Sequence, residues 1–276
     1  MAYKRILTIQ DISCLGQCSL TVALPILSAC GIETCVLPSA VLSTHTGGFT
    51  GYTFRDLTDD MPEILLHWEK EKLSFDGFYT GYLGSKTQID YVKKIMNSVG
   101  NAGNVKIVDP AMADGGKLYP GFDESFAAAM GSLCDEADII LPNITEACLI
   151  TKTDYKEKYD EEYIDSLLKR LTEKSEKTVI LTGVSFEENS TGVMVYENGN
   201  KKYYKHEKIS KGCHGTGDIF ASAFAGSFLK GKDAYTSAVI AADYVVDCIK
   251  ETIHDEAHWY GAKFEPVLGK LIGRLA

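Results

Sequence analysis

The segment that most suggests chemistry is a glycine-rich turn ending in an aspartate, formed by Gly215, Thr216, Gly217 and Asp218 and followed by an apolar run. Backbone amides at a helix start, with glycines that admit a close approach, bind anions readily. An aspartate in a first helical turn is also common for structural reasons, because it accepts hydrogen bonds from free amides and suits the helix dipole. The turn alone therefore leaves both interpretations open.

The aspartate distinguishes this turn from a simple phosphate-binding loop. The turn lacks the G-x-x-x-x-G-K-[ST] pattern and does not complete G-x-G-x-x-G. A site that only held phosphate would gain nothing from a carboxylate, whereas a kinase can use Asp218 to take the proton from a substrate hydroxyl while the amides stabilise the transferring phosphoryl group. We expect the helix dipole to keep Asp218 ionised and rather weakly basic, which phosphoryl transfer tolerates because it relies on positioning and charge stabilisation.

Oxygen-bearing side chains follow two other apolar runs. Asp109 and Asp114 lie in "VDPAMAD", and Asn143 and Glu146 lie in "PNITEA". The last two are three residues apart, so they share one side of a helix if a helix begins there. Such ligands suit Mg²⁺, which takes one or two carboxylates together with water and substrate phosphates. The alternative is that Asn143 caps a helix, that Glu146 completes the capping arrangement, and that Asp109 merely ends a strand before Pro110.

A long uncharged segment is a candidate substrate loop, because no formal charge occurs between Glu33 and Arg55. Its glycines let backbone approach a ligand, and its surface suits a small molecule with ring nitrogens and hydroxyls. A Ser/Thr-rich solvent loop is the alternative. His45 is either a general base or a hydrogen-bonding wall residue, and Tyr82 either stacks on a flat ring or fills the core. The polar residues of the segment that we consider for substrate contacts are Ser39, Ser43, Thr44, His45, Thr46 and Thr50.

Alternating strand-like and helix-like segments must position these residues. Nearly continuous apolar strands between helices predict an α/β fold with a mostly parallel sheet covered on both faces, whose ligands gather at the carboxyl ends of the strands. Near the C-terminus two strand-like runs flank "ENGN", which predicts a β-hairpin, and helices starting at Asp218, Ala234 and Glu265 follow. The expected strands are Arg5–Ile9, Thr34–Leu37, Gly77–Tyr79, Val105–Val108, Ile139–Leu141 and Val179–Leu181; the expected helices are Ser19–Cys30, Met61–Lys72, Gln88–Ser98, Glu124–Leu133 and Glu161–Lys174.

Composition narrows the class of protein. The 276 residues, 45% of them hydrophobic, can bury a core without disulfides, and no linker or repeat divides residues 1–276, so we expect a single domain. A net charge of −10 disfavours nucleic-acid and anionic-membrane surfaces. The uncharged stretch from Ile12 to Ile32 is interrupted by polar residues and is interpreted as a loop and a buried helix rather than a membrane span. The eight cysteines form no C-x-x-C pair, which favours reduced thiols in a cytoplasmic protein.

The order of these motifs resembles the ribokinase-like superfamily, and specifically its vitamin B6 branch, the pyridoxal/pyridoxamine kinases. "STHTGG", "TGYLGS", "VDPAMAD", "PNITEA", "LTG" and "GTGD" occur in the family order over nearly the whole chain. The resemblance implies a three-layer α/β/α sandwich, usually assembled as a homodimer. It also implies transfer of the γ-phosphate of ATP to the 5′-hydroxymethyl group of pyridoxal, pyridoxamine or pyridoxine, with Mg²⁺ and, in some members, a monovalent cation.

The resemblance also assigns roles to residues. Asp218 matches the catalytic base, and Gly215, Thr216 and Gly217 match the anion hole. The positions that match the magnesium site are Asp109, Asn143 and Glu146. Those that match the nucleotide site are Asp109, Asp114, Tyr119 and Thr182. Those that match the substrate site are Thr46 and Tyr82, with His45 beside them.

Two departures from the B6 pattern bear on the substrate. Asp11 stands where many B6 kinases have serine, and a carboxylate there can pair with a protonated ring nitrogen or an amine, which would favour pyridoxamine. Cys213 lies five residues before Asp218, and related hydroxymethylpyrimidine kinases carry a cysteine at the aspartate position itself. We interpret Cys213 as an inert buried residue, the other possibility being reversible addition to an aldehyde. The alternatives to a B6 kinase are a hydroxymethylpyrimidine kinase and a catalytically idle vitamer-binding protein.

Overall fold

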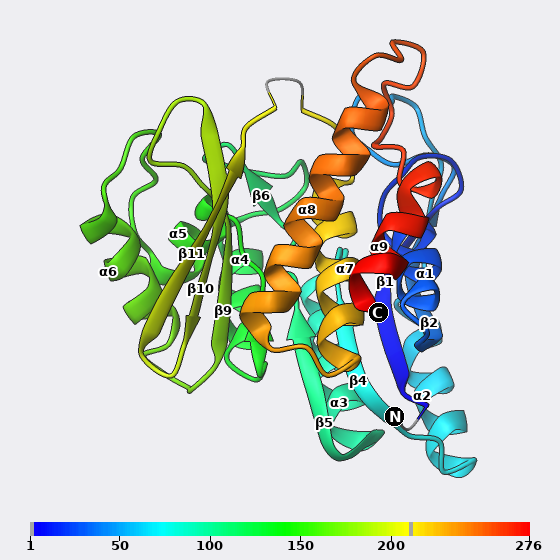
Figure 1. The fold of residues 1–276 in the computed structure, drawn as a ribbon. Helices are drawn as coiled ribbons and strands as arrows, with labels where there is room; N and C mark the ends of the chain where they lie inside the picture. Colours follow the sequence, from blue (N-terminus) through cyan, green and yellow to red (C-terminus); the bar gives the residue numbers. More distant parts are fainter. Residues whose placement is uncertain (1–2, 210–211) are drawn as a thin grey trace.

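The computed structural model describes residues 3–209 and 212–276 and contains one extended sheet between two layers of helices (Figure 1). The strand order is β11-β10-β9-β8-β5-β4-β1-β2-β3. Pairing from β2 through β9 is parallel, and β3, β10 and β11 add antiparallel edges. The strands are β1 (Arg5–Ser13), β2 (Glu33–Leu42), β3 (Phe54–Asp56), β4 (Phe75–Thr80), β5 (Gly100–Val108), β8 (Ile139–Ile140), β9 (Thr178–Val184), β10 (Ser190–Glu197) and β11 (Asn200–Glu207).

Alternating strand residues bury opposite faces of the sheet in two separate cores. Leu7 and Ile9 of β1 pack in the core beneath one helix layer, whereas Ile6 packs in the core beneath the other. The first layer contains α2 (Asp60–Lys70), α3 (Lys86–Ser98), α4 (Glu124–Cys134), α5 (Ile144–Thr151) and α6 (Glu161–Leu171). The second contains α1 (Leu20–Ala29), α7 (Thr216–Leu229), α8 (Ala234–Thr252) and α9 (Leu268–Leu275). The predicted α/β/α architecture is therefore confirmed.

The predicted hairpin is also confirmed, and its cause is local. β10 and β11 pair in register from Ser190 with Glu207 to Glu197 with Asn200. The turn residues Asn198 and Gly199 both have positive φ, 50° and 77°, as an Asn-Gly hairpin turn requires. A second small hairpin, β6 (Ala113–Asp114) with β7 (Lys117–Leu118), was not predicted; it lies directly after β5.

Several predicted boundaries differ from the structure. β1 continues past Ile9 to Ser13, with an irregular register to β2 around Asp11. β3 was missed because its three residues are all exposed and show no apolar alternation. The helix predicted from Glu265 begins as a 3₁₀ turn, η1 (Glu265–Val267), and α5 was foreseen only as one interpretation of the Asn143 motif. Within the described residues, none of the helices combines the length and apolar character needed to cross a bilayer.

Candidate active site

The start of α7 is shaped to leave backbone amides available. Gly215 is the N-cap, its φ is +77°, and no side chain caps the helix. The turn packs against the loop after β1 so closely that a Cβ at Gly215 would lie 1.6 Å from the Gln17 carbonyl oxygen. The Thr216 hydroxyl donates to the Cys213 carbonyl, 3.3 Å away, which braces the turn. This geometry matches the predicted anion hole, because uncapped first-turn amides attract negative charge.

Asp218 lies in the first turn of α7, partly buried against the loop after β1. Burial raises the pKa of Asp218 to about 7; a hydrogen bond from the Ser19 amide opposes this shift, and the charge of Asp11 adds to it. The expectation of a weakly basic carboxylate is therefore wrong, because burial outweighs the helix terminus. A carboxylate with this pKa is well suited to accept a proton near neutral pH.

Asp11 lies at the end of β1, close enough to Asp218 for the two charges to interact. Its side chain is 4% exposed and accepts a hydrogen bond from the Ser13 hydroxyl at 3.0 Å. Burial raises the pKa of Asp11, while hydrogen bonds from Ser19 and Ser13 lower it. Cys18, which the sequence did not single out, lies near both carboxylates; burial raises the pKa of its thiol, and the charges of Asp218 and Asp11 add to this shift. Cys213 packs at the edge of the α7–α8 core and is half-buried rather than buried; its inertness stays a prediction.

Asp109 and Glu146 form a second acidic pair at the ends of β5 and β8. Both are nearly inaccessible, 8% and 3% exposed, and burial raises the pKa of each carboxyl. Asn143 is the N-cap of α5 and forms a full capping box with Glu146, with distances of 2.9 and 2.8 Å. The amide nitrogen of Met112 also donates to Glu146, at 3.1 Å. The capping interpretation is thus correct, and it places the Glu146 carboxylate beside Asp109 rather than in solvent.

The acidic pair fits a magnesium ion held mainly through water and phosphate. No group of three or more His, Cys, Asp or Glu side chains within the described ranges has the arrangement of a closed metal site. Two buried carboxylates whose charges repel each other nevertheless favour a nearby cation, and Mg²⁺ commonly takes only one or two protein carboxylates. Asn143 already uses its amide oxygen for Glu146 and its amide nitrogen for the Ala113 carbonyl, so it positions Glu146 more than it offers a free ligand.

The positions assigned to the nucleotide surround this pair. Burial and the charge of Glu146 raise the pKa of the Tyr119 hydroxyl, which places that residue beside the acidic cluster. Asp114 is exposed on β6, where its carboxylate accepts a hydrogen bond from the Gly115 amide. Thr182 of β9 bonds through its amide to the Pro142 carbonyl at 2.9 Å, next to Asn143. The structure thus brings the residues that follow β5 and β8 together with residues of β6 and β9 at one edge of the sheet.

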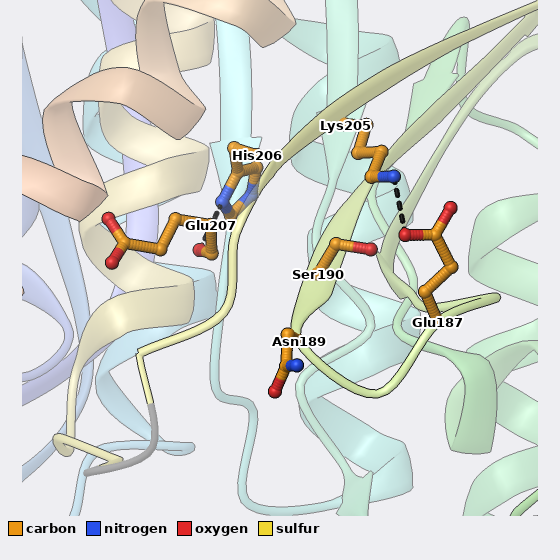
Figure 2. Close-up of a pocket in the computed structure, with 6 residues that line it drawn as sticks. All are labelled: Glu187, Asn189, Ser190, Lys205, His206 and Glu207. Atoms are coloured by element: carbon orange, nitrogen blue, oxygen red, sulfur yellow. Dashed lines mark hydrogen bonds and ion pairs between the residues drawn. The ribbon is translucent and has the colours of Figure 1, made fainter.

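A hollow of about 460 Å³ opens farther along the same edge, between the ends of β10 and β11 (Figure 2). It contains none of the residues predicted from the sequence. Figure 2 shows Lys205 turned toward Glu187, with which it forms an ion pair of 2.6 Å. The lining residues are Glu187, Asn189, Ser190, Lys205, His206 and Glu207.

The predicted substrate loop after β2 lies on the other side of Asp11. His45 is 5% exposed; its Nδ1 accepts from the Gly47 amide at 3.0 Å, so its Nε2 donates to the Tyr260 carbonyl at 2.6 Å. Because both ring nitrogens are occupied, the wall interpretation fits better than a general base. Tyr82 stacks on Phe122 with ring centroids 5.5 Å apart, and burial raises the pKa of its hydroxyl to about 12. Thr46 is exposed on the loop.

Residues 254–262, between α8 and η1, complete the surroundings of this loop and were not recognised from the sequence. Besides the Tyr260 contact, the Ala262 amide donates to the His214 carbonyl at 3.1 Å, and Trp259 packs on Phe49 with centroids 4.6 Å apart. In Figure 1 this segment is the orange-red loop beyond α8, beside the blue loop after β2. It shows no helical or strand periodicity, so only the aromatic pair Trp259 and Tyr260 offered a signal.

Comparison with known proteins is consistent with this geometry. The sequence profile of the phosphomethylpyrimidine kinase family matches residues 27–263. The chain belongs to this family. This family includes the hydroxymethylpyrimidine kinases, the alternative that the sequence left open. The match therefore supports the kinase assignment without choosing between pyridine and pyrimidine substrates. The chain thus has a ribokinase-like fold and belongs to a family of kinases.

Individual relatives of the chain are named for pyrimidine or for pyridoxal substrates. A hydroxymethylpyrimidine/phosphomethylpyrimidine kinase of Bacillus subtilis (strain 168) is 27% identical over 184 residues, which cover 66% of each chain, just under two thirds of that relative. A Bacteroides thetaiotaomicron protein named as a phosphomethylpyrimidine kinase and crystallised with pyridoxal is 35% identical, with a TM-score of 0.92 over 98% of this chain and 96% of that one. Pyridoxal kinase from Lactobacillus plantarum is 28% identical, with a TM-score of 0.92 over 99% and 98%.

Proposed function

We propose that this kinase transfers the γ-phosphoryl group of ATP to the 5′-hydroxymethyl group of a vitamin B6 vitamer. The observation that carries the proposal is the pyridoxal in the Bacteroides thetaiotaomicron structure, whose chain matches this one over nearly its full length at 35% identity. The site is compatible with that substrate, because Tyr82 is a flat aromatic wall and Asp11 is a buried carboxylate near Asp218.

In the proposed reaction, Asp218 takes the proton from the substrate hydroxyl. The hydroxyl oxygen attacks the γ-phosphorus of ATP, and ADP leaves. The amides of Gly215, Thr216 and Gly217 stabilise the negative charge on the transferring group. Asp109 and Glu146 are the residues that would hold Mg²⁺, which supplies neutralising charge at the phosphates. The proton then sits on Asp218 and the product is the 5′-phosphate.

A parallel rate measurement tests the substrate. We expect kcat/KM for pyridoxal, pyridoxamine or pyridoxine to exceed that for hydroxymethylpyrimidine by at least about 10-fold, since a site shaped for one ring discriminates against another through unpaired polar groups. ADP release is followed for all four compounds, and the phosphorylated product is identified by mass. Hydroxymethylpyrimidine is the second candidate, favoured by the family profile and the Bacillus subtilis relative. A higher kcat/KM for that compound would replace the proposal, and vitamer binding without ADP release would indicate the idle binder.

Asp11 makes a prediction about preference among the vitamers. No lysine or arginine in the described part of the chain forms an ion pair with this buried carboxylate, so a cationic nitrogen on the substrate would offset the free-energy cost of burying its charge. Replacing Asp11 with Asn or Ser should lower the preference for pyridoxamine over pyridoxal by about 10-fold, the size of one charge-assisted hydrogen bond. The ratio of kcat/KM values for the vitamers measures this preference. Ser13→Ala, which keeps the carboxylate, is the control; an unchanged ratio in both Asp11 variants would remove the idea.

A further inference from the structure

The substrate loop, residues 43–51, has little internal support. Its ends are joined by the Ser43 amide donating to the Thr53 carbonyl at 3.2 Å and by the Thr53 amide donating to the Ser43 hydroxyl at 2.9 Å. Between these ends, the hydrogen bond found inside the loop is the one from the Gly47 amide to His45. The loop also contains Gly48 and Gly51, both with positive φ. Its shape must therefore be fixed by the neighbours that it touches.

The 254–262 segment supplies much of that support from outside the loop, and the loop after β1 adds the Leu15 carbonyl, which accepts from the His45 amide at 3.2 Å. The Tyr260 carbonyl holds Nε2 of His45, and the Trp259 ring covers Phe49. Contact is also tight at Gly48, where a Cβ would lie 2.8 Å from the Trp259 ring. The loop is thus packed against this segment at three successive points of its length.

The same segment is tied to the other two loops of the site. The Ala262 amide donates to the carbonyl of His214, the residue before the anion hole. Gly261 packs on Gln17 in the loop after β1, and Gln17 donates to Glu265 at 2.9 Å. One stretch therefore contacts the loop that follows β1, the 43–51 loop and the turn that precedes α7.

We infer that the 254–262 segment holds the substrate loop in its binding conformation, and that Trp259 is the positioning residue of this device. The inference rests on the proposed function, because it takes the 43–51 loop to contact the vitamer. Trp259 is 49% exposed, so its ring contributes little to the core; it contacts the loop at Phe49 and at Gly48. Without it the loop gains conformations that the vitamer must restrict on binding, whereas the nucleotide end keeps its supports.

The test separates vitamer binding from turnover. Trp259→Ala should raise KM for the preferred vitamer by about 10-fold while kcat and KM for ATP stay within about twofold. The reason is that the free energy of ordering this loop reduces the affinity only of the ligand that the loop contacts. Trp259→Phe keeps an aromatic ring over Phe49 and should restore the wild-type KM. Trp68→Ala alters the other tryptophan of the chain, on α2 against Phe75, and serves as the matched control.

Calorimetric titration of the vitamer into each protein distinguishes the possible failures. Wild-type protein that binds no vitamer would refute the proposed function. Equal vitamer Kd for wild type and Trp259→Ala would overturn only the inference. A lower kcat together with higher KM values for both substrates and a lower melting temperature would show that Trp259 stabilises the fold. That result would also overturn the inference. If Trp259→Ala does not fold, Phe49→Ala removes the same ring contact from the loop side and is judged by the same outcomes.

Discussion

Asp218→Asn should reduce kcat by about 10³-fold, because the amide cannot accept the proton that a positioned general base removes. Asn keeps the size of the side chain and retains an oxygen for the Ser19 amide, so the start of α7 should stay in place. We expect the KM values for ATP and vitamer to change by less than about threefold, as for loss of an interaction made in the transition state.

Steady-state ADP release and thermal unfolding measure the two parts of this expectation. Asp243→Asn, on α8 where the half-buried carboxylate accepts from the Tyr204 hydroxyl, is a matched control that should keep full activity. A rate for Asp218→Asn within about tenfold of wild type would mean that this carboxylate is not the base, since general bases contribute more than this.

Gly215→Ala should lower kcat by at least about 100-fold, the effect of losing donors to a developing negative charge. The residue has a φ of +77°, and its new Cβ would lie 1.6 Å from the Gln17 carbonyl oxygen. A contact this short with backbone forces the turn away from the loop after β1, so the amides no longer converge with Asp218. Left-handed backbone with a Cβ adds a stability cost of about 1–2 kcal/mol.

Gly212→Ala isolates the geometric argument for the turn. A Cβ at Gly212 meets nothing within 4 Å, and its φ lies outside the positive range, although it is only three residues from Gly215. It should therefore leave kcat unchanged. Similar rates for the two alanine variants, measured with folded proteins of known melting temperature, would contradict the predicted role of the Gly215 turn.

The sequence was a good guide where the structure depends on local chemistry. The Asn198 and Gly199 turn closes its hairpin because few residues tolerate positive φ at both positions. The spacing of Asn143 and Glu146 allowed two interpretations, and the capping box shows that they are not exclusive, because capping is what holds the carboxylate beside Asp109. Convergence of the motifs followed from one rule, that parallel strands end at the same edge of a sheet.

Features that depend on contacts between residues far apart in the chain could not be predicted from the sequence. The pKa of Asp218 depends on its burial and on Ser19 and Asp11, which lie about two hundred positions earlier in the chain. The bond between His45 and the Tyr260 carbonyl spans 215 positions and uses a backbone atom, so no side-chain pattern announces it. β3 was missed because pairing with β2, rather than its own exposed residues, makes it a strand. The homodimer and the monovalent cation stay predictions.

The most direct test of the central claim, that Asp218 accepts the hydroxyl proton, is the pH dependence of the rate. A base works in its ionised form, so kcat/KM should rise as the pH increases through the Asp218 pKa of about 7 and level off above it. Titration of the nucleotide or vitamer affects wild type and Asp218→Asn alike, so the comparison isolates the carboxylate. We predict that this rise is present in wild type and missing from the residual rate of Asp218→Asn; the same rise in both proteins would contradict the account.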